Sequence, residues 1–427
     1  KASACLFALN DLLGTRGPGL DEGKWPLAST ADHMRVASSL FLPVLLTEVW
    51  LVTSFNLSSH SPEASVHLES QDYENQTWEE YTRTDPREEE EEEEEKEEGK
   101  DEEYWLRASQ QLSNETSSFG FNLLRKISMR HDGNVIFSPF GLSVAMVNLM
   151  LGTKGETKVQ IENGLNLQAL SQAGPLILPA LFKKVKETFS SNRDLGLSQG
   201  SFAFIHKDFD IKETYFNLSK KYFDIEYVSI NFQNSSQARG LINHCIVKET
   251  EGKIPKLFDE INPETKLILV DYVLFKGNAT MLVVLMEKTG DYLALEDYLT
   301  VDLVETWLQN MKTRKMEVFF PKFKLNQRYE MHELLKQMGI RRLFSTSADL
   351  SELSAMARNL QVSRVLQQSV LEVDERGTEA VSGTLSEIIA YSMPPAIKVN
   401  RPFHFIIYEE MSRMLLFLGR VVNPTVL

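Results

Sequence analysis

Apolar residues along this chain follow two periodicities, one typical of helices and one typical of buried strands. Residues 119–127 carry apolar side chains at helical spacing, which predicts an amphipathic helix. Two near-continuous apolar runs rich in β-branched residues, 265–277 and 279–286, predict central strands covered on both faces. Residues 316–325 predict a third strand, which a proline interrupts.

Local signals at the ends of segments predict further elements. Residues 135–137 predict a short buried strand, after which Ser138 is a helix-cap candidate and Pro139 suits the first helical turn. Residues 236–254 predict a second amphipathic helix. The segment YEMHELLKQMGI, residues 329–340, predicts a helix ended by its glycine.

The C-terminal segment, residues 401–424, contains two apolar strands around a polar turn. Long strands mixed with helices, without a regular βα alternation, indicate an α+β domain with large sheets. With 427 residues, 42% of them hydrophobic, the chain has enough apolar material for one large domain or two ordinary ones.

Residues 34–54 predict a signal peptide. Their apolar run, 40–52, is interrupted by Pro43 and Glu48 and is too short for a membrane span, but it follows a short basic start as a signal does. Residues 1–33 precede this initiator-like methionine, so we expect a non-native upstream extension outside the fold. A signal peptide predicts secretion to the extracellular space.

Most of the net charge of −15 comes from one local run, residues 85–103, which contains unbroken glutamate from 88 to 95. A block of like charges repels itself and stays solvated, so residues 55–110 predict a disordered acidic tail. The alternative is a tail that docks on a basic partner or on the protein's own basic face. The remainder gives no nucleic-acid footprint, and the ordered domain is expected at 111–427.

Several residue types bear on modification and redox state. The two cysteines, Cys5 and Cys245, predict no disulfide framework, and with Cys5 upstream of the fold, Cys245 is expected as a small buried hydrophobe. Six sequons agree with the secretory route and are candidate glycosylation sites: Asn56, Asn75, Asn114, Asn217, Asn234 and Asn278.

No catalytic constellation is recognisable in the sequence. His332 begins a segment like a zinc-protease helix, but Lys336 stands where the second histidine belongs. Neither a phosphate-loop spacing nor a GxSxG motif occurs. We therefore expect neither an enzyme nor a metal or small-molecule cofactor. An enzyme whose site no motif reveals is the remaining alternative.

Residues 374–395, DERGTEAVSGTLSEIIAYSMPP, form the segment hardest to assign to a core element. They are too rich in Gly, Ser and Thr for a core helix and too rich in strand formers for a plain linker. Small residues alternate at Thr378, Ala380 and Ser382, which matches the period of two of a strand. An exposed segment able to become a strand is one interpretation, and an ordinary surface loop is the other.

Seven segments resemble successive motifs of the serpin family, in serpin order: NVIFSPFGLSVAMVNLMLGTKGET, LINHCIVKETEGKI, DYVLFKG, FFPKFKL, QMGIRRLFSTSADLSEL, ERGTEAVSG and RPFHFIIYEE with FLGRVVNP. Together they span about residues 112–424. The resemblance implies an α+β fold with a large central β-sheet, two smaller sheets that are incomplete here, surrounding helices and an exposed reactive-centre loop at residues 375–399.

The resemblance also implies an activity, inhibition of serine proteases by a covalent trap. The protease would attack the Tyr391–Ser392 bond and become acylated, after which the loop would insert into the main sheet as an extra strand. The inserting hinge would consist of Glu375, Gly377, Thr378, Ala380 and Ser382.

Tyr391, the residue before the predicted reactive bond, is relevant to which proteases and cofactors the resemblance implies. Trypsin-like proteases carry a buried aspartate in the specificity pocket, so a tyrosine fits them poorly. The resemblance implies that protein Z, bound to a membrane, positions factor Xa, and that factor XIa is a second target of a monomeric inhibitor. The residues at cofactor-contact positions are Met129, Asp132 and Asp297. Lys183, Lys184 and Lys186 are a heparin-binding candidate or, alternatively, ordinary solvated lysines.

The sequence departs from the serpin pattern after Gly277, which runs directly into Asn278 where serpins continue into a tryptophan and several strands. Loss of this stretch of roughly fifty residues is expected to leave neighbouring strands with unpaired edges. It would also remove part of the cofactor-contact surface. The alternative function is therefore a non-inhibitory or inactive serpin-fold binding or carrier protein.

Overall fold

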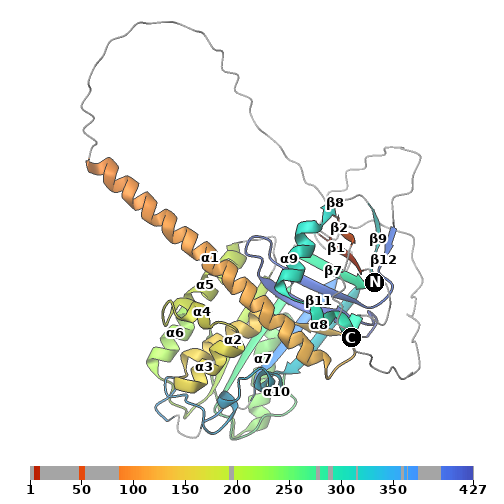
Figure 1. The fold of residues 1–427 in the computed structure, drawn as a ribbon. Coiled ribbons are helices and arrows are strands. Elements are labelled where there is room, and N and C mark those ends of the chain that lie inside the picture. The colour runs from red at the N-terminus through yellow and green to blue at the C-terminus, as the bar shows by residue number, and fades with distance from the viewer. Residues whose placement is uncertain are drawn as a thin grey trace, which may run out of the picture. The chain divides into compact units, whose positions relative to one another are not determined.

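The structure, a computed structural model, describes residues 4–9, 48–52, 86–191, 197–275, 279–286, 292–313, 316–356, 360–362, 364–373 and 396–426. The chain divides into two compact units, residues 1–53 with 109–427, and residues 54–108. Helices and three sheets make up the described part (Figure 1), so the α+β class is confirmed.

The helices are α1 (Pro86–Ser128), α2 (Pro139–Leu151), α3 (Gly155–Gly164), α4 (Gln168–Ser171), α5 (Ile177–Ser191), α6 (Glu213–Phe223), α7 (Ser235–Glu249), α8 (Tyr292–Tyr298), α9 (Val301–Asn310), α10 (His332–Gln337) and the 3₁₀ turn Arg342–Phe344. The strands are β1 (Ala4–Leu9), β2 (Glu48–Val52), β3 (Val135–Phe137), β4 (Leu197–His206), β5 (Glu226–Ile230), β6 (Leu267–Phe275), β7 (Thr280–Met286), β8 (Lys312–Thr313), β9 (Glu317–Phe319), β10 (Phe323–Glu330), β11 (Leu366–Val373), β12 (Ala396–Lys398), β13 (Phe403–Tyr408) and β14 (Leu415–Val421).

Helix α2 is almost wholly buried and starts as the sequence predicts. Ser138 caps it by accepting a 3.0 Å hydrogen bond from the Gly141 backbone N–H, and Pro139 occupies the first turn. Gly141 lets the helix approach β6 closely, because a Cβ there would lie 2.8 Å from atoms of Asp271 and Val273. The helix therefore packs directly on the five-stranded sheet.

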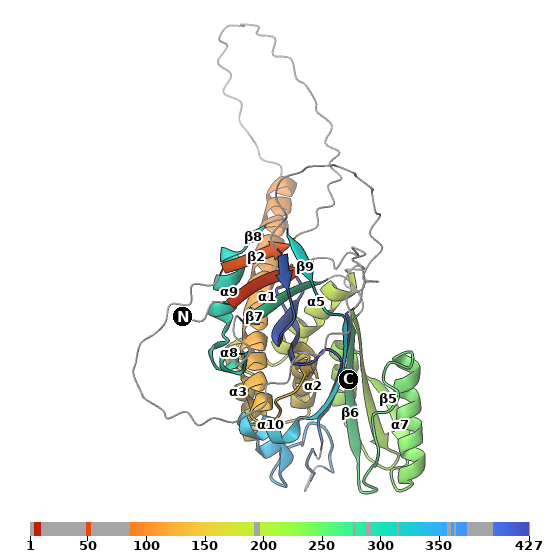
Figure 2. The ribbon, with the colours of Figure 1, turned by 90° about the vertical axis from the view of Figure 1, so that its right-hand side faces the viewer.

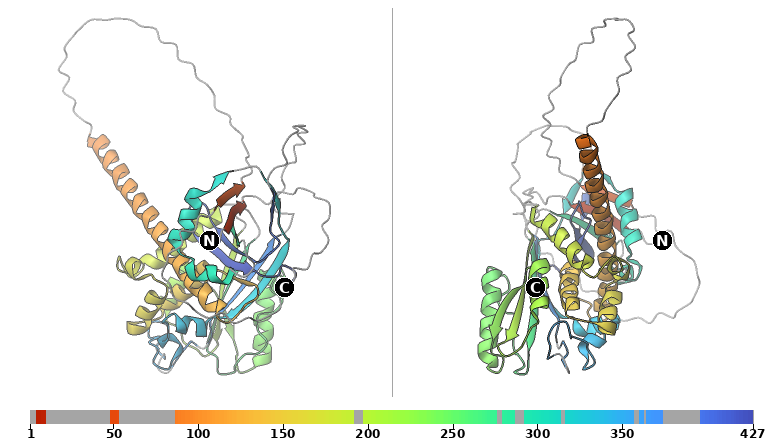
Figure 3. Two further views of the ribbon diagram at one scale, coloured as in Figure 1. Left: turned by 45° about the vertical axis from the view of Figure 1, so that its right-hand side comes forward. Right: turned by 90° about the vertical axis from the view of Figure 1, so that its left-hand side faces the viewer.

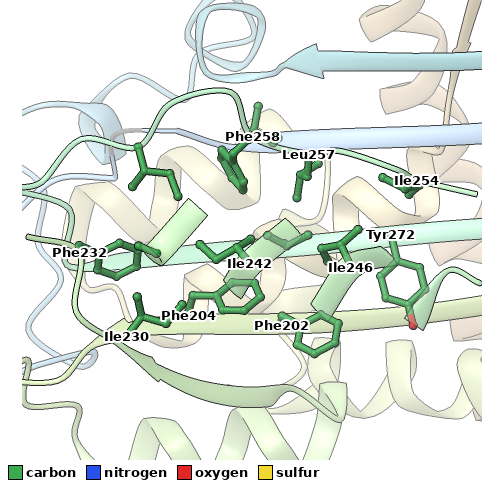
Figure 4. Close-up of a cluster of buried hydrophobic side chains, with 14 of the residues drawn as sticks. Phe202, Phe204, Ile230, Phe232, Ile242, Ile246, Ile254, Leu257, Phe258 and Tyr272 are labelled. Atoms are coloured by element: carbon green, nitrogen blue, oxygen red, sulfur yellow. The ribbon is translucent and has the colours of Figure 1, made fainter. Parts of the chain in front are cut away.

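That central sheet has the strand order β10-β11-β6-β4-β5. Helix α2 covers one face and α7 the other, as Figure 2 and the right-hand view of Figure 3 show. On the α7 face a cluster of buried side chains joins the sheet, the helix and the following loop (Figure 4). Phe202 and Phe204 of β4 stack there at 5.5 Å between ring centroids and pack with Ile242 and Ile246 of α7.

A second sheet has the order β3-β14-β13-β7-β1-β2-β8, and a third pairs β12 with β9. The link from β6 to β7 passes through residues 276–279, so β7 follows the central sheet almost at once. Its neighbour is β1, which pairs antiparallel with it from Ala4↔Met286 to Leu9↔Met281, and β2 pairs with β1 (Figure 1).

Two short strands lie within the segments expected as an upstream extension, 1–33, and a signal peptide, 34–54, and both expectations stay predictions. Residues 4–9 form β1 and residues 48–52 form β2. The physical reason is the open edge of β7: its unpaired backbone groups can bond with any apolar strand that reaches them. The unpaired edge expected at this position is thus covered.

Within the segment expected as an acidic tail, 55–110, the structure describes residues 86–110, which are part of α1. Residues 316–325 form two strands rather than one, since Pro321 separates β9 from β10. The predicted helix 329–340 is shorter, because Tyr329 pairs with Gln367 as part of β10. Helix α7 ends before Gly252, which has a positive φ of 79°.

Cys245, expected as a buried hydrophobe, is only partly buried against the cluster on the α7 face, and burial raises the pKa of its thiol. Within the described residues, no helix is both long enough and apolar enough to span a bilayer.

The pairing of β1 with β7 generates a prediction. Deleting residues 1–10 should expose the β7 edge, so that the chain forms dimers or larger species through strand pairing. Light scattering coupled to size-exclusion chromatography measures the mass. Deleting residues 15–25, which leaves both upstream strands intact, is the matched control. A monomeric 1–10 deletion would contradict the edge-covering role of β1.

Candidate functional site

The reactive-centre loop predicted at residues 375–399 lies mostly outside the described residues. Strand β11 ends at Val373 and β12 begins at Ala396, so the described chain enters and leaves the loop at these points. The predicted reactive bond Tyr391–Ser392 lies outside the described residues. So do the hinge residues Glu375, Gly377, Thr378, Ala380 and Ser382.

The site that would receive the loop is the boundary between β6 and β11, here called the seam. The two strands pair in parallel, from Leu366↔Val270 to Leu371↔Phe275. Their outer neighbours are antiparallel to them, β10 to β11 and β4 to β6. A strand that turned back after Val373 would therefore run antiparallel to both strands of the seam and could bond with each.

Side chains tie each strand of the seam to its outer neighbour. Ser201 of β4 donates a 2.8 Å hydrogen bond to Asp271 of β6, and Gln368 of β11 donates a 2.7 Å bond to Asn326 of β10. These two bonds lie within the outer strand pairs, so opening the sheet at the seam would not break them. A cavity of about 270 Å³ lies beside the seam, lined by residues of β6, of α2 and of the segment leading into β11.

Gln367 connects the seam to the N-terminus of α2. Its side chain donates a 2.7 Å hydrogen bond to the Ser138 carbonyl and accepts a 3.2 Å bond from the Ser138 backbone N–H. The glutamine is buried, so both bonds replace contacts with water. The position of β11 is thereby fixed to the helix that covers the inner face of the sheet.

The predicted cofactor-contact residues Met129, Asp132 and Asp297 are all exposed. The first two follow α1, and Asp297 lies on α8. Arg125 of α1 donates hydrogen bonds to the Glu296 and Leu299 carbonyls, at 2.9 and 2.5 Å, which holds α8 against α1. The structure therefore places the three predicted residues on two adjoining segments.

Beneath these segments lies a buried charge cluster that consists of Glu296, His404 and Arg420. All three are at most 2% exposed. His404 Nε2 and Arg420 Nη1 each lie 2.8 Å from Glu296 Oε1. Burial alone would raise the pKa of Glu296, but the hydrogen bond and charge of His404 and the Arg420 guanidinium hold that pKa below its ordinary value.

The predicted heparin-binding lysines lie on α5. Lys183 pairs with Glu187 at 3.7 Å, Lys186 donates a 3.4 Å hydrogen bond to the Phe223 carbonyl, and Lys184 is exposed. The adjoining helix α6 adds Lys220 and Lys221 in its last turn. Lys183 and Lys186 therefore already have intramolecular contacts.

The sequon asparagines fall into two groups. Asn114, Asn217 and Asn234 are exposed, and Asn234 caps α7 by accepting a 3.2 Å hydrogen bond from the Gln237 backbone N–H through its side-chain oxygen. A glycan attaches to the nitrogen, so glycosylation and capping are compatible at Asn234. Asn56, Asn75 and Asn278 lie outside the described residues.

The buried cluster of Glu296, His404 and Arg420 was not among the predicted site residues. The available signal was polar residues in otherwise apolar strands, His404 in FHFIIY and Arg420 in LLFLGRV. A buried histidine or arginine needs a partner, so each predicts a buried acid nearby. The sequence does not indicate which acid that is, because Glu296 is distant along the chain.

The family model described as Serpin (serine protease inhibitor) matches residues 114–280 and 276–424. The chain belongs to the serpin family, and it is a serpin-type protease inhibitor rather than an enzyme. The two matched stretches meet at residues 276–280, where the sequence departs from the serpin pattern.

The chain is similar to several named serpins. Mouse Protein Z-dependent protease inhibitor is 88% identical over 448 residues, which include 92% of this chain and 100% of that protein. The human protein of the same name is 62% identical over 452 residues, with the same coverage. Rat Alpha-1-antiproteinase is 30% identical over 371 residues, 74% of this chain and 90% of the relative. An alignment of 448 positions with a 427-residue chain must include positions at which this chain has no residue.

Solved structures agree with the fold. The crystal structure of mouse protein-Z dependent protease inhibitor matches with a TM-score of 0.70 and 84% identity, covering 76% of this chain and 100% of that one. Human glycosylated kallistatin matches with a TM-score of 0.67 and 25% identity, covering 75% and 100%. Both confirm the serpin fold.

The buried charge cluster generates a prediction about stability. Glu296→Gln should lower the free energy of unfolding at pH 7 by about 3 kcal/mol, because Arg420 loses its buried counter-charge. The pKa of Glu296 is depressed in the folded state, so its contribution is present above the ordinary carboxyl value of 4.5 and declines as the pH falls below it.

Urea unfolding of both proteins between pH 7 and pH 3.5 tests this prediction, and the difference between parent and variant should shrink toward the acid end. Glu333→Gln removes an exposed carboxylate 2.7 Å from Lys336 and should leave the unfolding midpoint nearly unchanged. A difference that stays constant with pH would show that Glu296 is not ionised in the folded protein.

Proposed function

We propose that this chain is a secreted suicide-substrate inhibitor of serine proteases. Its proposed targets are factor Xa, which it would inhibit in the presence of protein Z, phospholipid and calcium, and factor XIa. The observation that carries the proposal is the parallel pairing of β6 with β11 directly before the loop. An extra antiparallel strand at the seam would bond on both sides, which supplies a driving force for insertion.

The proposed reaction starts at the Tyr391 carbonyl carbon. The protease serine attacks it, the bond to Ser392 breaks, and the new amino group leaves with the proton that the protease histidine transfers. Tyr391 stays bound to the protease as an ester. Insertion of residues 375–390 into the seam would carry the acylated protease away from its resting geometry, so that hydrolysis of the ester is prevented.

Two arguments favour protein Z as the cofactor. The similar mouse and human proteins are named for it. Met129, Asp132 and Asp297 form an exposed surface on two clamped segments, as a protein contact needs. A tethered cofactor compensates for the poor fit of Tyr391 by raising the effective concentration of the protease near the loop.

Heparin binding and glycosylation complete the proposal. The lysines at 183, 184 and 186, with Lys220 and Lys221 on the neighbouring helix, would bind sulfated polysaccharide through their summed charge. Glycans would attach to the exposed Asn114, Asn217 and Asn234.

A second candidate function is a serpin-fold binding or carrier protein that traps no protease. The short link from β6 to β7 favours it, because the segment that other serpins place there is absent and β1 occupies the edge of β7. This function needs the fold but no insertion at the seam.

A denaturing gel separates the two functions. The chain is incubated with factor XIa alone, and with factor Xa plus protein Z, phospholipid and calcium. A covalent band at the summed mass of inhibitor and protease supports the trap. Recovery of intact chain, or of chain cleaved at Tyr391 without a complex, supports the non-inhibitory alternative.

Small residues alternate at Thr378, Ala380 and Ser382, and a substitution there can distinguish a loop that inserts into the sheet from one that stays on the surface. Thr378→Arg should convert the inhibitor into a substrate, because a charge at this position would enter the sheet without a partner. Glu379→Arg is the matched control, since the neighbouring side chain of an inserted strand points to the opposite face.

We expect at least a tenfold loss of covalent complex for Thr378→Arg, with cleaved chain in its place, a change that corresponds to about 1.4 kcal/mol in partitioning. Complex yield for Glu379→Arg should stay near that of the parent. Equal yields for all three proteins would refute the assignment of Thr378 to the inserted face.

A further inference from the structure

We propose that Arg420 is a positioning residue. It would hold the segment after α1 and helix α8, which carry the proposed protein Z contact surface, in a fixed position relative to each other. The inference rests on the proposed function, because the surface is the one that carries Met129, Asp132 and Asp297. Arg420 is on β14, 0% exposed, and contacts no partner protein itself. Its effect on binding would act entirely through the segments above it.

The guanidinium of Arg420 contacts both segments at once. Toward the end of α1 and the segment after it, Arg420 donates from Nη1 to Ser128 Oγ at 2.9 Å, from Nη2 to the His131 carbonyl, and from Nε to the Gly133 carbonyl at 2.9 Å. Toward α8 it donates from Nη1 to Glu296 Oε1 at 2.8 Å. These contacts enclose the segment with Met129 and Asp132 and reach the residue preceding Asp297.

Arginine suits this role because its planar fork presents several donors in fixed directions. Three nitrogens serve acceptors on two segments, whereas a lysine has a single nitrogen and cannot span them. The Tyr292 ring at the start of α8 lies 5.9 Å from the Arg420 guanidinium carbon, which adds a second contact to that helix. The geometry therefore depends on the guanidinium shape as well as on its charge.

The surface that Arg420 supports combines apolar and acidic groups. Met129 is 78% exposed and Tyr298, which follows Asp297, is 66% exposed. Exposed apolar side chains next to carboxylates fit a partner that presents basic residues around an apolar patch. A shift between the two segments would separate these groups, although each side chain would remain present and exposed.

Arg420→Lys tests the inference because it keeps a positive charge beside Glu296 but removes the planar guanidinium and its several N–H donors. We expect protein Z to bind the variant 10- to 30-fold more weakly in a biosensor measurement. The rate of factor XIa inhibition without protein Z should stay within twofold of the parent. Ser128→Ala removes a single contact of Nη1 and should weaken protein Z binding about threefold, which gives a milder variant if Arg420→Lys folds poorly.

Two controls separate positioning from a general loss of stability. Ser219→Ala removes a buried 2.7 Å hydrogen bond to Asn148 on other elements and should lower the melting temperature without affecting protein Z binding. Combined with Asp297→Asn, Arg420→Lys should be less than additive, since both act on the same contact. Additive effects, or an equal loss of binding in Ser219→Ala, would overturn the inference.

Hydrogen exchange gives a readout that needs no partner. In Arg420→Lys, amide exchange should rise at residues 129–133 and 292–298 and stay unchanged at the seam. Unchanged exchange at both segments would overturn the inference even if protein Z binds the parent. A further outcome is that protein Z fails to bind the parent chain while amide exchange in Arg420→Lys rises as expected. That result would refute protein Z as the cofactor but would support the role of Arg420 in holding the two segments together.

Discussion

The parallel pairing of β6 with β11 is the constraint on which the proposed activity depends. Both strands have antiparallel outer neighbours, and hydrogen bonds between side chains bind each to its own neighbour, Ser201 with Asp271 and Gln368 with Asn326. The β10–β11 and β4–β6 pairs therefore meet along a parallel boundary, and parallel pairing is slightly less stable per residue than antiparallel pairing. The cavity of about 270 Å³ lies beside that boundary, and β11 leads into the predicted loop.

Buried polar groups set the positions of the segments around the sheets. Gln367 fixes β11 to the cap of α2, and Arg420 joins the end of α1 to α8 through buried hydrogen bonds. A buried polar or charged group that lacks its partners costs desolvation free energy. Arrangements in which these partners are missing are therefore disfavoured, and one arrangement is specified. In this protein the same interactions that hold the fold together also define the geometry of its exposed surfaces.

Apolar periodicity was enough to predict β6, β7 and α2, because burial on both faces or a capped apolar helix leaves a clear local pattern. The start of α2 at Ser138 was predicted correctly for the same reason. The Glu296 cluster was not predicted, since it joins residues distant in the sequence. Strands β1 and β2 were missed because the sequence indicates an unpaired edge near β7 but not which distant segment pairs with it.

Strand β1 also has a kinetic consequence. Its partner β7 lies about two-thirds of the chain length away, so the pair has a very large sequence separation. Closing so long a loop is entropically costly and slow, and contacts of this kind form late in folding. During synthesis the first strand leaves the ribosome long before its partner exists. Until β7 is made, β1 is an unpaired apolar segment, the kind of surface that aggregates or is bound by chaperones.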